Sequence, residues 1–176
     1  MTTPPILAGT LQTDPRSGGL KRTSGVQIDP EVARAWDEVR DDANKDVDYV
    51  LIGYDGPSKT QLRVLDKGRG GLQTLGTQCF PSEMLATQYN QDGVVFGGVK
   101  LIATTNRFVS FLYIDSDLCP AVKKGRTLMV RTAMHANENS NIRSLLEGTV
   151  ATVFTSYPTH TVFLILFVVV YFYGFD

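Results

Sequence analysis

Residues 93–115, GVVFGGVKLIATTNRFVSFLYID, hold two runs of β-branched and aromatic residues on either side of a short polar turn at Thr105-Asn106. Valine, isoleucine, phenylalanine and tyrosine are residues that strands favour. Strands joined by so short a turn pair antiparallel, because a parallel pair needs a crossover of a dozen or more residues. This stretch therefore predicts a β-hairpin within a sheet.

A second hairpin and a helix are predicted upstream. The run YVLIGY (49–54) is followed by the turn signal Asp55-Gly56-Pro57, and TQLRVLD (60–66) then alternates between polar and apolar residues. Before them, IDPEVARAWDEVRDD (28–42) predicts an amphipathic helix, with Asp29 as a good N-cap. Four apolar residues at helical spacing form the stripe that packs inward: Val32, Ala35, Trp36 and Val39.

The rest of the chain adds helices and one strand. We expect a mobile glycine-rich loop at KGRGGLQTLGT (67–77), a short helix at PSEMLATQY (81–89) and a basic helix at about 120–136. After it we expect a polar break at NENSN (137–141), a short helix at IRSLLEG (142–148) and a strand at TVATVFTSY (149–157). Hairpins in place of βαβ crossovers predict an α+β fold with a mixed, largely antiparallel central sheet flanked by helices.

The composition is that of a globular chain without a catalytic or metal-binding motif. With 176 residues, 43% of them hydrophobic, the chain is long enough for one domain with a core. Its net charge of −1 gives no global attraction to nucleic acid or to a membrane surface. His135 and His160 suggest no proton relay, and Cys79 and Cys119 are expected to be free thiols. We therefore expect no enzyme, no cofactor, no metal and no nucleic-acid partner.

The predicted basic helix has an unusual distribution of charge. Lys123, Lys124 and Arg126 fall in its first turns, where the helix dipole disfavours cations. No acidic residue occurs between Asp117 and Glu138. The cations either form an ordinary solvated face or meet an acidic partner, which the exposed amides of the first turn would also attract.

A helical projection of residues 120–136 separates an apolar face from a basic one. The apolar face is formed by Val122, Met129 and Ala133, and the broadly opposite face by Lys123, Lys124 and Arg131. Arg126 lies nearer the apolar edge, where its stem covers the seam and its guanidinium reaches outward.

Taken in order, four segments resemble the ADF/cofilin homology family of actin-binding domains, and most closely its coactosin-like branch. They are SGVQIDPEVARAWDEVRDD (24–42), YVLIGYDG (49–56), RFVSFLYID (107–115) and PAVKKGRTLMVRTAM (120–134). They are similar to the opening helix, the first strand with its turn, the central strand, and the actin-binding helix that follows it. The resemblance implies a sandwich of the gelsolin-like type, with five to six strands between helices, that binds actin without catalysis.

The resemblance also implies which residues bind actin. Lys124 and Arg126 match the basic pair on the family's long helix. Arg107 matches a basic residue at the start of the central strand that coactosin-like proteins use for filament binding. Lys123 and Arg131 are further cations of the same helix and complete the expected set. The implied partner is actin, as filaments bound at their side rather than as monomers, in the cytoplasm and at the cytoskeleton.

The expected actin-binding domain covers residues 24–157 and follows a flexible leader. Residues 1–23 are rich in Pro, Gly, Thr and Ser and show no period. Ser24 matches the serine that is phosphorylated near the N-terminus of cofilins. The long leader and the absence of this control from the coactosin branch make regulation at Ser24 the minor expectation.

The apolar tail, residues 158–176, departs from the family, whose final strand leads into a polar, amphipathic helix. Residues 161–175 carry no charge, but they are fewer than the ~20 residues that a membrane-spanning helix needs. Three interpretations stay open: a buried final strand or helix, a tail anchor, or an atypical or misassembled terminus. With a tail anchor, the chain would be a membrane-anchored adaptor whose basic helix meets acidic lipid or a protein partner. That adaptor is the alternative to an actin-binding module.

Overall fold

The computed structural model of this chain describes residues 25–56, 59–89, 91–102 and 105–156. Within them, six strands form one mixed sheet in the order β1-β3-β2-β4-β5-β6. The strands are β1 (Gln27–Ile28), β2 (Tyr49–Tyr54), β3 (Gln61–Gly68), β4 (Val94–Leu101), β5 (Arg107–Ile114) and β6 (Thr149–Thr155). The expected α+β class and the expected central sheet are confirmed.

Antiparallel pairing holds the centre of the sheet, and parallel pairing holds its two edges. The hairpin of β4 and β5 pairs along its whole length, from Val94 opposite Ile114 to Leu101 opposite Arg107. The predicted hairpin of β2 and β3 is antiparallel too, and β2 joins β4 in the same sense. At the edges, β1 is parallel to β3 and β6 is parallel to β5. β6 therefore needs a long crossover, which helices supply.

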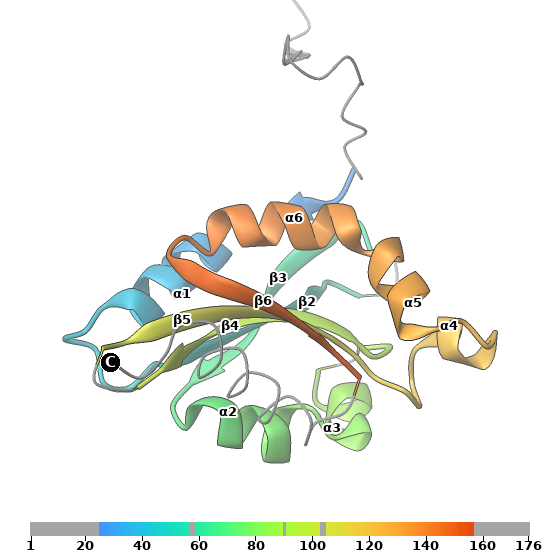
Figure 1. Ribbon diagram of the computed structural model, residues 1–176, viewed down its shortest axis with the longest axis horizontal. Helices are drawn as coiled ribbons and strands as arrows, with labels where there is room; N and C mark the ends of the chain where they lie inside the picture. Colours follow the sequence, from blue (N-terminus) through green and yellow to red (C-terminus); the bar gives the residue numbers. More distant parts are fainter. Residues whose placement is uncertain (1–24, 57–58, 90, 103–104, 157–176) are drawn as a thin grey trace, which may run out of the picture.

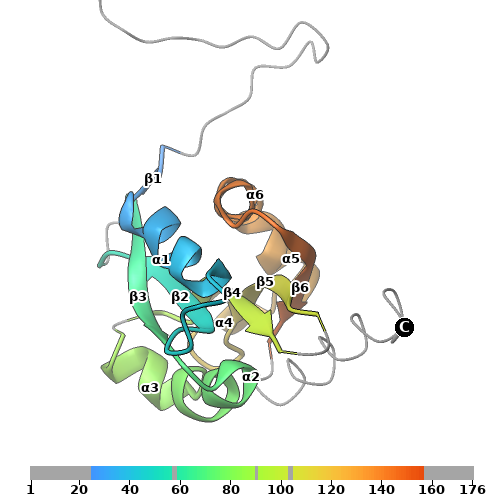
Figure 2. The ribbon, with the colours of Figure 1, turned by 90° about the vertical axis from the view of Figure 1, so that its left-hand side faces the viewer.

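Helices cover both faces of the sheet (Figures 1 and 2). One face carries α1 (Glu31–Arg40), α5 (Leu128–Met134) and α6 (Ala136–Leu145). The other carries α2 (Gly71–Thr74), the π-helix η1 (Leu75–Cys79) and α3 (Ser82–Thr87). The short helix α4 (Pro120–Lys123) follows β5 at one end of the sheet (Figure 1). The crossover α4–α5–α6 thus leaves the end of the sheet and returns over one face.

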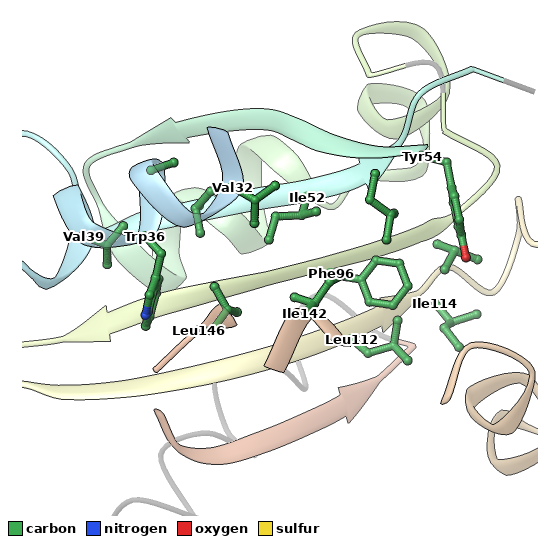
Figure 3. Close-up of a cluster of buried hydrophobic side chains, with 14 of the residues drawn as sticks. Val32, Trp36, Val39, Ile52, Tyr54, Phe96, Leu112, Ile114, Ile142 and Leu146 are labelled. Atoms are coloured by element: carbon green, nitrogen blue, oxygen red, sulfur yellow. The ribbon is translucent and has the colours of Figure 1, made fainter. Parts of the chain in front are cut away.

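Alternation of side chains along the strands builds two cores. In β2, Val50 and Ile52 belong to the core under α1 and α6, while Tyr49 and Leu51 belong to the core under η1 and α3. The whole predicted stripe of α1 is buried in the first core (Figure 3). Its largest member, Trp36, also donates a hydrogen bond from Nε1 to the backbone carbonyl of a residue just beyond α6, at 2.9 Å. This bond ties the two helices of one layer together.

Two adjacent glycines in β4 make room for close packing on the two faces of the sheet. A Cβ at Gly98 would collide with the Trp36 ring, and a Cβ at Gly97 with the Phe111 ring and the Val50 carbonyl. Because neighbouring residues of a strand point to opposite faces, Gly98 makes room for Trp36 of α1 on one face and Gly97 for the Phe111 ring of β5 on the other. This explains why a run rich in strand-forming residues contains two that disfavour strands.

The glycine-rich segment 67–77 is not the mobile loop that we expected. β3 continues to Gly68, and α2 and η1 follow it. Gly70 and Gly71 have positive φ angles of 109° and 51°, which only glycine adopts readily, so the chain turns sharply into a helix. The Asp48 carboxylate accepts hydrogen bonds from both of their amides, at 3.0 and 2.8 Å. The glycines therefore serve a fixed turn.

The basic segment also differs from its prediction. Instead of one helix over 120–136, the chain forms α4 and α5 with a break between them, and the expected polar break at 137–141 is helical within α6. Gly125 has a φ of 69°, a left-handed conformation that ends a helix. Thr127 then caps α5 by accepting a hydrogen bond from the Val130 amide at 3.4 Å. α6 runs through NENSN because Glu138 and Ile142, four residues apart, both turn inward.

The predicted leader 1–23, Ser24 and the apolar tail 158–176 lie outside the described residues. Within the part that the structure describes, no helix has the length and apolar character needed to cross a membrane.

Candidate functional site

A buried carboxylate fixes the point at which the chain leaves β5. Asp115 is 2% exposed. It accepts hydrogen bonds from Ser82 Oγ at 2.8 Å and Tyr113 OH at 3.1 Å, and from the amides of Asp117 and Leu118 at 2.7 and 2.8 Å. Burial, together with this carboxylate, raises the pKa of the Tyr113 phenol, which stays a donor. The segment that leads into α4 is therefore anchored to α3 and to β5.

Lys124 and Arg126 lie in the break between α4 and α5, and both side chains are exposed. α4 ends at Lys123, and the Arg126 amide donates a hydrogen bond to the Ala121 carbonyl at 3.1 Å across the turn. Lys124 therefore follows the C-terminal end of a helix, where the dipole favours cations. Arg126 precedes the cap of α5 and belongs to neither helix. The break thus relieves most of the electrostatic conflict that a continuous helix would have had.

Three large apolar side chains are exposed on α5 next to these cations. Met129 is 79% exposed, Val130 42% and Met134 50%. Arg126 Nη1 lies 3.1 Å from Met134 Sδ, so the guanidinium lies along the helix. We call Lys124, Arg126, Met129, Val130 and Met134 the α4–α5 surface. It combines apolar area with positive charge, which suits a protein partner with acidic groups around an apolar contact.

Arg131 is buried, although the helical projection placed it on the basic face, opposite the apolar one. It is 8% exposed, and its Nε and Nη1 find no hydrogen-bond partner among the described residues. Met129, expected on the packed face, is exposed instead. Both errors have one cause. The projection assumed a continuous helix, and the break at Gly125 changes the phase of everything after it.

The apolar half of the α4–α5 surface was missed for the same reason. Gly125 was the available signal, because a glycine inside a helical pattern often marks a helix end. If a new helix begins after Thr127, the helical period restarts there. The position of Met129 relative to Val122 then no longer predicts that Met129 is packed.

The other predicted site residues lie apart from this surface or are not described. Arg107 is half-buried at the start of β5, whereas α4 follows the far end of that strand, at Ile114. At a rise of about 3.3 Å per residue, ~23 Å of strand separate the two ends. The structure therefore does not bring Arg107 together with Lys124 and Arg126. The side chain of Lys123 lies outside the described part of the structure.

His135 forms the joint between α5 and α6. Its Nδ1 lies 3.0 Å from Tyr54 OH, and its ring stands edge-on to Phe96 with 6.3 Å between centroids. Burial lowers the pKa of His135 from its ordinary value, against a smaller raising effect of the Glu138 carboxylate. The imidazole is therefore neutral at pH 7, and its contact with Tyr54 connects the helical joint to the end of β2.

The described residues contain no group of three His, Cys, Asp or Glu side chains placed to hold a metal ion. Cys79 and Cys119 are free, as predicted, and both are buried. Burial raises the pKa of the Cys79 thiol, which keeps it protonated and unreactive.

The sequence itself matches neither a protein-family model nor a curated protein. Solved structures do match. A cofilin from Streptomyces griseoflavus is 11% identical, with a TM-score of 0.56, over 77% of this chain and 89% of that one. The cofilin homology domain of a yeast actin-binding protein is 13% identical, with a TM-score of 0.53, over 77% of this chain and 92% of that one.

The mixed sheet between two helical layers is therefore the fold of the ADF/cofilin homology family. The alignment with human coactosin-like protein, which has the same fold, covers more of this chain than the alignments with those two structures. That protein is 18% identical, with a TM-score of 0.57, over 86% of this chain and 92% of that one. The family resemblance seen in the sequence is thus confirmed at the level of the fold.

Proposed function

We propose that this chain binds actin without catalysis, and that it binds filaments in the manner of coactosin-like proteins. The observation that carries the proposal is the α4–α5 surface on an ADF/cofilin homology fold. Two exposed cations lie beside three exposed apolar side chains, and the sequence has no acidic residue from 118 to 137. Cytoplasmic, cytoskeletal localisation follows from this proposal.

The α4–α5 surface supplies two kinds of contact to a partner. Met129, Val130 and Met134 would lose water on binding, and the thioethers adapt readily to an irregular apolar surface. Lys124 and Arg126 would pair with carboxylates at the rim, which sets orientation and speeds association. Arg131 is left out of the proposed contact because its guanidinium is buried.

Arg107 is proposed as a separate, second contact. It lies at the opposite end of β5, so one small acidic patch cannot meet both it and Arg126. A filament presents a long, repeating surface, and a bound domain can touch it at two places. The preference for filaments over monomers rests on the resemblance to the coactosin-like branch.

High-speed cosedimentation with filamentous actin tests the proposal. The wild type should pellet, and Lys124→Glu/Arg126→Glu should weaken binding by about tenfold or more. The matched control is Arg34→Glu/Arg69→Glu, which makes the same charge change at exposed cations on α1 and before α2. The control should pellet like the wild type.

The outcomes separate the surface from the function. If the wild type does not pellet, actin binding is wrong. If it pellets and both charge-reversed variants pellet equally well, the α4–α5 surface is not the binding site. Arg107→Glu should weaken pelleting while leaving any complex with monomeric actin, measured by analytical ultracentrifugation, unchanged.

The alternative of a membrane-anchored adaptor rests on the apolar tail, residues 161–175, which lies outside the described residues. No observation in the described part of the structure favours it, and we do not propose it.

A further inference from the structure

A groove runs between α5, α6 and the edge strand β6. Its volume is about 570 Å³. Its walls are formed by Met129 and Ala133 of α5, Ala136, Asn139 and Arg143 of α6, and Phe154 of β6. A cavity of this size lies in the range that binds ligands or a few inserted side chains.

We propose that this groove is a second docking site, which takes an acidic amphipathic helix of a protein partner. Of the α4–α5 surface, only Met129 also lines this groove. The proposal does not depend on actin binding, because none of its other residues belongs to the proposed actin contact.

The apolar side chains of the groove wall are suited to contact side chains of a partner. Phe154 is 41% exposed although it lies opposite the fully buried Leu112 of β5. It faces the helices and not the outside of the sheet, since Leu112 belongs to the core under α1 and α6. An exposed aromatic ring beside an exposed methionine is the kind of apolar area that a partner buries.

The small residues of the wall favour a helix as the occupant. Ala133 and Ala136 carry only methyl groups, so a partner backbone can approach α5 and α6 closely at the joint. Between Ala136 and Arg143 the same wall offers Asn139, a donor and acceptor for the partner's polar edge. A helix with one apolar face, laid into an apolar groove, is a common mode of peptide recognition.

The charge of the groove favours an acidic occupant. Among the described residues, no Asp or Glu lines it, and the exposed Arg143 does. Glu138 is on the same helix, but it is buried, and its carboxylate acts on His135 through its charge. An amphipathic helix with glutamates flanking its apolar face would therefore meet a complementary surface.

The test uses the full-length protein and a defined probe. The probe is a fluorescein-labelled 16-residue helical peptide with Leu at positions i, i+3, i+4 and i+7 and Glu on the other face. The matched peptide has Lys in place of Glu. Fluorescence anisotropy should show binding of the acidic peptide, with the basic one weaker by about tenfold or more.

Variants then locate the binding. Phe154→Ser should weaken binding of the acidic peptide by about tenfold or more. Ile102→Ser, which removes a still more exposed apolar side chain after β4, should leave that binding unchanged. If Phe154→Ser proves poorly folded by circular dichroism, Ala136→Glu replaces it. This change fills the groove and places a negative charge in the first turn of α6, where the dipole favours it.

Two results would overturn the proposal. One is equal binding of the acidic and basic peptides. The other is that Phe154→Ser and Ala136→Glu both bind the acidic peptide as tightly as the wild type does. Self-association of the protein through this face, seen by analytical ultracentrifugation and lost in Ala136→Glu, would identify a second copy as the occupant and also overturn it. Actin cosedimentation should be unaffected by Phe154→Ser, so the two proposals fail separately.

Discussion

At the scale of single residues, the most unusual feature is the buried guanidinium of Arg131. Its Nε and Nη1 have no hydrogen-bond partner among the described residues. Removing these groups from water is unfavourable where no hydrogen bond offsets the loss of hydration. Its neighbours in the sequence, Met129 and Val130, are in solvent instead. α5 thus holds a polar residue inside and apolar residues outside, an arrangement that folding stability alone would not favour.

The first prediction follows from this. Arg131→Met keeps the length of the side chain and removes a buried cation whose Nε and Nη1 have no partner among the described residues, so the free energy of unfolding should rise by about 1–4 kcal/mol. Urea denaturation measures it. Arg34→Met, at an exposed site, should change stability by no more than about 0.5 kcal/mol. A clear loss of stability in Arg131→Met would mean that the guanidinium has acceptors in solution.

His135 supplies a prediction about pH. Its folded-state pKa is lowered by burial, so the unfolded chain takes up the proton first as the pH falls. The neutral imidazole therefore contributes stability above its ordinary pKa, about 6.5. This contribution is lost as the pH falls from there toward the folded-state pKa. The groups that face the imidazole are Tyr54, Glu138, Lys59 and Asp92.

Thermal unfolding of the wild type between pH 7.5 and 5 should show this loss. His135→Gln, which retains a partner for Tyr54 OH, should be less stable at pH 7.5 but should have a flatter dependence on pH. Equal slopes for the two proteins would show that His135 does not titrate differently on folding.

At the scale of the elements, the break between α4 and α5 determines what the molecule presents. It sets Lys124 and Arg126 in a turn, changes the phase of α5 and exposes Met129 and Met134. Gly125 makes it, through a left-handed backbone conformation that other L-residues adopt only with strain.

Gly125 can therefore be tested by two substitutions. A Cβ at this position would meet no atom within 4 Å, so any effect is conformational and not steric. Gly125→Ala should lower the free energy of unfolding by about 1–2 kcal/mol. Gly125→Asn should lower it less, because asparagine tolerates the left-handed region. If both variants match the wild type in urea denaturation, the turn does not have this conformation in solution.

The elements also show what the sequence could and could not predict. The hairpins and α1 followed from local patterns, because period-2 and 3.6-residue stripes report burial directly. β1 was not predicted, since two residues show no period. The polar composition of 137–141 gave no sign of a helix. In the structure these residues are helical within α6, whose Glu138 and Ile142 are buried. The inward orientation of Arg131 follows from tertiary packing after a break, which no helical projection contains.

At the scale of the whole molecule, the proposed actin contacts lie at the start of β5 and beyond its far end, and not in one cleft. Lys124 and Arg126 were predicted as exposed cations, and the structure leaves them exposed. Arg107 is at the other end of β5, a separation that follows from the direction of one strand and could have been foreseen. The apolar members of the α4–α5 surface and the groove beside β6 appear only once α5, α6 and the sheet edge are placed together.

The parallel attachment of β6 has a consequence for the order of assembly. Contacts within the β4–β5 hairpin close short loops, whereas Phe108 of β5 pairs with Thr149 of β6 only about 40 residues later in the chain. Closing the longer loop costs more entropy before any contact rewards it. We expect the antiparallel centre to form first and the crossover helices with β6 to dock onto it last.

Native-state hydrogen exchange checks this expectation. Amides of α5, α6 and β6 should exchange through an opening of lower free energy than those of β2, β4 and β5. Uniform protection across the sheet would contradict it. The unit that docks last also carries the α4–α5 surface and the groove. A partner bound at either place would therefore stabilise the part of the chain that opens most easily. Binding should then slow amide hydrogen exchange throughout this unit, well beyond the residues that the partner contacts.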